Sequence, residues 1–171
     1  MTPDRPERKN PRLRGWDYSA GGTYFVTICT KDQRHTLSSL AVGGDAHIAP
    51  QNRLTPLGLL AERYLSSIPG VIKSVVMPNH VHFLVTLEGG PMWASAPTRT
   101  PEQRPVRVPV PSLAGVVRSY KTLVTKAWGM PVWQRGYYDH IVRSENDFLR
   151  IWTYIDNNPL RWELDRYYTE R

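Results

Sequence analysis

The sequence has few of the residues that build disulfides, cysteine-rich metal cages or membrane spans. It contains one cysteine, Cys29, among 171 residues, which excludes an intramolecular disulfide and a cysteine-based metal cage. It has no apolar run that approaches the roughly 18 residues of a membrane-spanning helix. The first 16 residues are polar, charged and rich in proline, which is not the pattern of a signal peptide. We therefore expect a cytoplasmic protein with no membrane partner.

Acidic residues are scarce relative to basic ones. There are 15 Asp and Glu residues against 22 Lys and Arg residues, so the formal net charge is +7 and the sequence pI is about 9.8. This excess favours a polyanionic partner, and because no long basic amphipathic helix is evident, nucleic acid is favoured over a membrane surface. The length fits one domain, and 40% apolar residues are enough to form a core.

The order of the predicted elements indicates an α+β fold. Strands are predicted where β-branched and aromatic residues gather, and helices where apolar residues recur every three or four positions. The predicted strands are 23–30, 46–49, 71–77, 80–87 and 132–142 (broken at Gly136), and the predicted helices are 56–68, 112–128 and 145–158. A turn signal at Pro78-Asn79 predicts that two of these strands form an antiparallel hairpin. We expect an antiparallel sheet with helices packed on one face.

Two segments fall outside this pattern. Residues 1–15 carry five Lys or Arg residues and three prolines, which predicts a basic arm without regular structure. Residues 89–111 contain six prolines with arginines between them, which predicts a long, exposed, basic loop. The expected organisation is therefore a single domain, 16–171, preceded by the arm and interrupted by the loop.

The His80-Val81-His82 tripeptide is the first candidate for chemistry. Alternate residues of a strand point to the same face, so both imidazoles should lie on one side of the predicted sheet. Two neighbouring imidazoles can bind one metal ion. They can equally line a solvated surface, and the tripeptide alone leaves both interpretations open.

Tyr154 and Asn158 are the second candidate pair. A separation of four residues places both side chains on one face of the last predicted helix, beside its apolar stripe. A tyrosine hydroxyl can be a covalent nucleophile, and an asparagine amide oxygen can bind a hard divalent cation. Alternatively, Tyr154 is an aromatic at the edge of the core and Asn158 ends the helix. Tyr137 and Tyr138 are rival nucleophiles.

Basic residues interleaved with aromatic ones form the third candidate feature. This combination suits single-stranded nucleic acid, whose phosphates attract cations and whose bases stack on rings. The predicted phosphate contacts are Arg5, Arg8, Lys9, Arg12, Arg14, Arg118, Lys121, Arg135, Arg143 and Arg150. Each of these residues could also be an ordinary surface charge, so the set is more informative than any single member.

Three blocks, taken in order, resemble the motifs of a known family. Residues 75–85 resemble the HUH motif of single-tyrosine transposases, the insertion-sequence-200-like family, and residues 133–143 and 154–161 resemble its second and third blocks. The opening segment 21–27 also fits. The pattern most resembles the REP-associated tyrosine transposases, and the resemblance extends from about residue 16 to residue 162.

This resemblance implies a ferredoxin-like (RRM-like) fold with the HUH pair on a central strand. It implies Mg²⁺ or Mn²⁺ held by His80, His82 and a polar residue one turn after the catalytic tyrosine. That tyrosine maps to Tyr154 and the third ligand to Asn158, with Asn157 adjacent to it. No small-molecule cofactor is implied, and both monomers and homodimers occur in the family.

The implied activity is metal-dependent cleavage and rejoining of single-stranded DNA at hairpin-flanked sites through a 5′-phosphotyrosine link, in a nucleoid-associated protein. The main alternative is a domesticated, catalytically idle protein that binds hairpin DNA. A single-stranded RNA-binding domain is less favoured because the strands lack a clear aromatic signature. A metallo-hydrolase of small molecules fits neither the net charge nor the basic arm.

Overall fold

The computed structural model describes residues 21–41, 51–87, 111–165 and 167–168. The predicted basic arm, the predicted strand 46–49 and nearly all of the predicted loop 89–111 lie outside these ranges. No helix among the described residues is long and apolar enough to cross a membrane.

The central element is a four-stranded antiparallel sheet with the order β4-β5-β1-β6. Its strands are β1 (Gly22–Cys29), β4 (Val71–Val76), β5 (His80–Leu87) and β6 (Tyr138–Val142), and the helices are α1 (Pro56–Ser66), α2 (Leu113–Trp128) and α3 (Glu145–Asn157). The chain order β1-α1-β4-β5-α2-β6 with this strand order is the ferredoxin-like arrangement. The predicted α+β fold, the hairpin of β4 with β5 and the central position of the HUH pair are confirmed.

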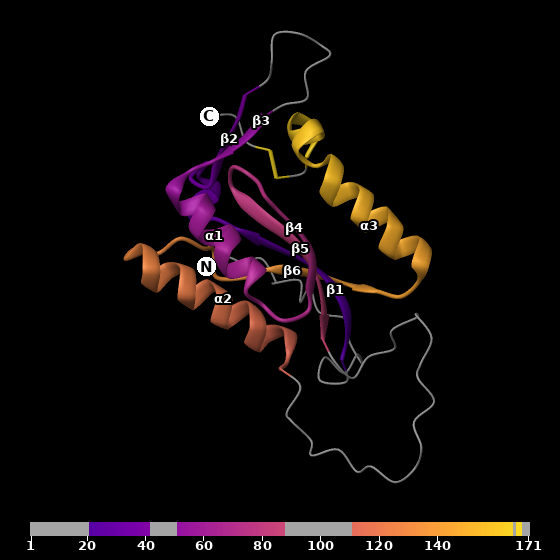
Figure 1. Cartoon of the computed structure of the whole chain (residues 1–171). Coiled ribbons are helices and arrows are strands. Elements are labelled where there is room, and N and C mark those ends of the chain that lie inside the picture. The colour runs from indigo at the N-terminus through magenta and orange to yellow at the C-terminus, as the bar shows by residue number, and fades with distance from the viewer. Residues whose placement is uncertain (1–20, 42–50, 88–110, 166, 169–171) are drawn as a thin grey trace, which may run out of the picture.

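Helices α1 and α2 lie side by side on one face of the sheet (Figure 1). This face holds the larger core, because alternate residues of β5 point into it, with Val81, Phe83 and Val85 all fully buried. The helices add apolar side chains at helical spacing, such as Val117 and Tyr120 of α2. Hydrophobic burial on this face therefore fixes the sheet and the two helices relative to one another.

Helix α3 lies on the opposite side of the sheet from α1 and α2 (Figure 1). It packs Ile151 and Ile155 against a smaller apolar cluster that contains Phe25 and Leu84 of the sheet. The Ser144 hydroxyl caps the helix by accepting a hydrogen bond from the backbone N–H of Asp147 at 3.2 Å. The prediction of helices on one face thus holds for α1 and α2, and α3 adds a second layer over the other face.

A second, two-stranded sheet was not expected from the sequence. It pairs β2 (Ser38–Ala41) with β3 (Gln51–Leu54) in antiparallel register. Each strand has only four residues, which is too short for an alternation pattern to be recognised. The predicted extended segment 132–142 is regular only in β6, while Trp133 forms an isolated bridge with Thr30. Short 3₁₀ helices, η1 (Lys31–Gln33) and η2 (Pro159–Leu164), complete the described elements.

Candidate active site

The two histidines of β5 lie on the α3 side of the sheet. Both are fully buried, and their ring centroids are 4.3 Å apart. Strand β5 is an interior strand, and its partner β1 places Thr27 opposite His82. The shared face that the His-x-His spacing predicts is therefore observed, and the pair lies in the interior instead of on a solvated surface.

The hydrogen bonds of His80 define which of its nitrogens carries the proton. The side-chain amide of Asn79 donates to the Tyr167 carbonyl at 2.8 Å, so its oxygen Oδ1 faces His80 Nδ1, also at 2.8 Å. Because Oδ1 can only accept, Nδ1 carries the hydrogen and Nε2 presents a lone pair. His80 Nε2 is buried and has no hydrogen-bond partner among the described residues.

Helix α3 brings Tyr154 to the second histidine. The Tyr154 hydroxyl lies 3.3 Å from His82 Nε2, although the two residues are 72 positions apart. The other ring nitrogen of His82, Nδ1, lies 2.8 Å from the Thr27 hydroxyl, which fixes the orientation of the ring. Tyr154 is 37% exposed, so the residue is partly open to solvent although its hydroxyl lies beside His82.

A carboxylate that the sequence did not reveal completes the cluster. Asp165 Oδ2 accepts hydrogen bonds from the Tyr154 hydroxyl at 2.8 Å and from Asn158 Nδ2 at 2.6 Å. Oxygen or nitrogen atoms of His80, His82 and Asp165 lie within 4.8 Å of one another, close enough to hold one metal ion. Asp165 follows η2 in an irregular segment, and no spacing rule links such a residue to the histidines.

The donor set fits a divalent cation. Besides His80 Nε2, the amide oxygen of Asn158 is buried without a hydrogen-bond partner in the described part of the chain. Buried polar atoms are normally paired, so two orphaned acceptors beside a carboxylate are the pattern expected of metal ligands. Asn158 was predicted as the third ligand, and the geometry adds Asp165 as a further oxygen donor.

Burial opposes the charged forms of His80 and Tyr154. Burial lowers the pKa of His80 from 6.5 to about 4, although the negative charge of Asp165 acts in the opposite direction. His80 is therefore neutral near pH 7, as a metal ligand must be. Burial, together with the hydrogen bond and charge of Asp165, raises the pKa of Tyr154 well above its ordinary value.

Aromatic side chains of the C-terminal segment cover the histidines. The Tyr167 ring lies 4.9 Å from His80 and 5.9 Å from His82, centroid to centroid, and the Trp162 ring lies 5.8 Å from His80. Beside them is an open cavity of about 400 Å³ lined by Tyr154, His82 and Asp165, among other residues. Tyr138, a rival nucleophile, lines the same cavity, whereas Tyr137 lines a different one beside α2.

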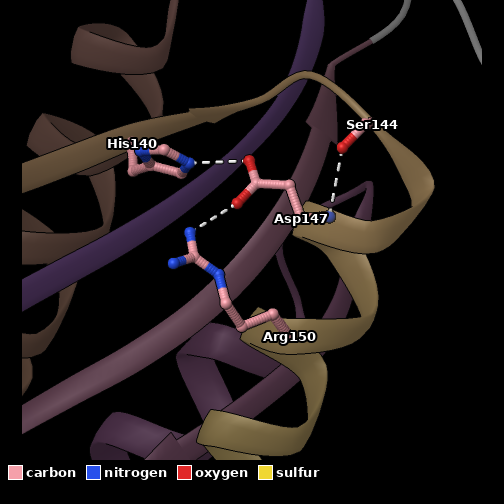
Figure 2. A network of polar contacts seen from close by, with 4 residues as sticks. All are labelled: His140, Ser144, Asp147 and Arg150. Atoms are coloured by element: carbon pink, nitrogen blue, oxygen red, sulfur yellow. Dashed lines mark hydrogen bonds and ion pairs between the residues drawn. The ribbon is translucent and has the colours of Figure 1, made fainter.

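His140 and Arg150 also line this cavity, and both contact Asp147 in a polar network (Figure 2). Asp147 accepts hydrogen bonds from His140 Nε2 at 2.7 Å and from Arg150 Nη2 at 2.8 Å. Burial by itself raises the pKa of Asp147, but these hydrogen bonds and the charge of His140 outweigh it and hold that pKa below its usual value. Arg150 was predicted as a phosphate contact, whereas Asp147 was not singled out from the sequence.

The other predicted phosphate contacts are distributed over the molecule. Arg118, Lys121 and Arg135 line a second open groove of about 520 Å³ between α2 and the segment before β6. Lys121 donates to the carbonyl oxygens of Gln134, Arg135 and Gly136, so its ammonium holds that segment in place. Arg143 is exposed next to β6. The five predicted contacts of the N-terminal arm lie outside the described residues.

Comparisons with known proteins agree with this fold. No family model matches the chain. An uncharacterised protein of Haemophilus influenzae is 31% identical over 177 residues, covering 95% of this chain and 94% of that protein. A solved structure of a REP-associated tyrosine transposase bound to a REP hairpin matches with a TM-score of 0.55 and 20% identity, over 91% of this chain and 76% of that one. The chain thus belongs to the same family as the Haemophilus influenzae protein and has the fold of a REP-associated tyrosine transposase, with His80 and His82 placed as an HUH pair.

Proposed function

We propose that this protein cleaves and rejoins single-stranded DNA at hairpin-flanked sites, in a metal-dependent reaction that passes through a 5′-phosphotyrosine link. The observation that carries the proposal is the position of the Tyr154 hydroxyl, 3.3 Å from His82 Nε2 on a different element. A covalent nucleophile beside a donor set that fits a divalent cation suits phosphoryl transfer. The net charge of +7 and the solved structure of similar fold, a REP-associated tyrosine transposase bound to a REP hairpin, support a hairpin nucleic acid as the substrate.

The proposed metal site consists of His80, His82, Asp165 and Asn158. Their nitrogen and oxygen atoms suit Mg²⁺ or Mn²⁺, both of which accept oxygen-rich coordination. When bound, the cation supplies Lewis-acid stabilisation of charge on the scissile phosphate. Asn79 and Thr27 support the site from behind, because each orients one imidazole through its Nδ1 atom.

The chemical step uses the groups that already touch one another. The Tyr154 oxygen forms a bond to phosphorus and the bond from phosphorus to the 3′ oxygen breaks, and that oxygen takes a proton from water to become a 3′-hydroxyl. The hydroxyl proton passes to Asp165, whose Oδ2 already accepts its hydrogen bond at 2.8 Å. A second 3′-hydroxyl can reverse the step and join two strands, because the energy of the phosphodiester bond is kept in the link.

A covalent-adduct assay tests this proposal. Labelled single-stranded hairpin DNA from the flanks of the gene is mixed with the protein and Mn²⁺ or Mg²⁺, and denaturing electrophoresis detects protein-bound label. We expect a metal-dependent adduct that is absent in Tyr154→Phe and in the presence of a chelator. Tyr138→Phe is the matched control, because Tyr138 lines the same cavity and should be dispensable. An adduct that survives Tyr154→Phe but not Tyr138→Phe would assign the nucleophile to Tyr138.

One observation favours a second candidate, a catalytically idle protein that binds hairpin DNA. The Tyr154 hydroxyl is held by Asp165, and its raised pKa opposes the loss of the proton that attack requires. Tight hairpin binding without any adduct would support this alternative. In both candidate functions, hairpin binding should weaken steeply as the salt concentration rises, because it depends on neutralising phosphates.

A further inference from the structure

Two members of the polar network of Figure 2, His140 and Arg150, line the cavity that also contains Tyr154. The strand register places Thr27 between His82 and Tyr138, and Phe25 between Leu84 and His140. His140 is therefore two strands and two residues away from His82, a separation of roughly 12 Å between Cα atoms at ordinary strand spacings. It is too far away to share a metal ion with His82, so the network marks a second position along the cavity.

Phe25 connects the two positions. Its ring lies 5.1 Å from the His82 ring and 5.9 Å from the Tyr154 ring, and it is opposite His140 in the register of β1 and β6. Phe25 also lines the cavity. An apolar ring between two polar positions suits a nucleotide strand, whose sugars and bases contact rings while its phosphates seek donors.

The network is arranged to present donors at a fixed place. Asp147 fixes both His140 and Arg150, and its own helix position is fixed by the cap from Ser144. The Arg150 side chain is 75% exposed and uses one of its nitrogens in the bond to Asp147, so the rest of its donor fork can face a ligand. A guanidinium held in this way is suited to bind phosphate oxygens.

A role in stabilising the fold does not by itself explain why His140 and Arg150 both contact Asp147. An ion pair between Asp147 and an exposed arginine three positions along the same helix contributes little to stability, and it does not require a histidine on the neighbouring strand to join it. We propose that Arg150, oriented together with His140 by Asp147, binds the phosphate of a nucleotide next to the scissile one and so sets the register of the strand in the cavity. This proposal rests on the proposed function.

Single neutral phosphates provide the test. A series of hairpin substrates carries one methylphosphonate at successive positions on either side of the cleavage site, and binding is measured in the Tyr154→Phe background. We expect one flanking position at which neutralisation weakens binding about tenfold. Arg150→Gln should weaken binding of the unmodified substrate by a similar factor. A methylphosphonate at that flanking position should not weaken the binding of Arg150→Gln any further. His140→Asn should weaken binding of the unmodified substrate by a smaller factor and should reduce, without removing, the response to the methylphosphonate at that position.

Arg63→Gln is the matched control, because Arg63 is exposed on α1 and so lies on the other face of the sheet. It should retain the full response to every methylphosphonate. Circular dichroism of Arg150→Gln should match the parent protein, since the side chain is largely exposed. If a methylphosphonate at each position weakens binding by Arg150→Gln as much as it weakens binding by the parent, the proposal is wrong even though DNA is bound. If the parent binds none of the hairpins, the proposed function fails and this inference fails with it.

Discussion

Strand β5 presents two different chemistries on its two faces. Val81, Phe83 and Val85 point towards α1 and α2 and pack into the larger apolar core. His80 and His82, in alternation with them, point towards α3 and are equally buried. The same degree of burial therefore has opposite energetic consequences, because apolar surface gains from leaving water whereas imidazoles lose hydration.

The α3 face is where the protein gives up stability in order to form a site. Among the described residues, His80 Nε2 and the Asn158 amide oxygen are buried without hydrogen-bond partners on the α3 side. Leaving such atoms unpaired costs about 1–3 kcal/mol each. A bound cation would offset that cost, which is why the α3 face should depend on metal and the α1–α2 face should not.

The largest expected effect is on the polar face. His82→Ala removes one proposed metal ligand and should lower metal-dependent cleavage by at least about a thousandfold, since metal catalysis contributes several kcal/mol. We expect Mn²⁺ to raise the melting temperature of the parent protein, and His82→Ala should abolish that rise. Normal cleavage by His82→Ala would contradict the assignment of the α3 face as the metal site.

The next effect belongs to the apolar face. Phe83 is fully buried, with its ring 6.4 Å from that of Tyr120. Phe83→Ala should lower the free energy of unfolding by about 3–5 kcal/mol, because it leaves a cavity in the main core. Urea denaturation measures this change. The folded fraction should still be stabilised by Mn²⁺, and loss of that stabilisation would show that the two faces are not independent.

A smaller effect should appear in how the free energy of unfolding of the metal-free protein depends on pH. The pKa of His80 is about 4 in the folded state and 6.5 ordinarily, so between these values the unfolded chain binds the extra proton. The free energy of unfolding should therefore fall by about 3 kcal/mol as pH drops from 6.5 to 4. Above pH 6.5 His80 is neutral in both states and should cause no loss of stability. Urea denaturation with chelator at pH 4.5 and pH 7 measures the fall. His80→Gln should reduce it, and an unchanged fall in that variant would assign it to other groups.

The smallest effect concerns Lys121, which lies on α2 and was predicted to contact DNA. Its ammonium donates to three carbonyl oxygens before β6, so Lys121→Met should lower the free energy of unfolding by about 1–2 kcal/mol. Hairpin affinity, measured well below the melting temperature, should change little. Unchanged stability combined with weaker binding would instead place Lys121 in the DNA interface.

Much of the fold was predictable because its signals are local. The alternation in β5 and the helical spacing in α2 predicted those elements to within one residue of their observed ends. The four-residue strands β2 and β3 were missed because they carry too few positions for a pattern. Asp165 was missed for another reason, since its place beside Tyr154 depends on the path of the chain after α3.

The strand and helix periods can be predicted from the amino-acid pattern, and with them the shared face of His80 and His82 and the shared face of Tyr154 and Asn158. The packing of the elements brings these two faces together, adds Asp165 to them and links His140 to Arg150 through Asp147. The reason is physical. Side-chain direction within one element follows from backbone geometry, whereas the approach of different elements follows from how α3 packs its apolar stripe against the sheet.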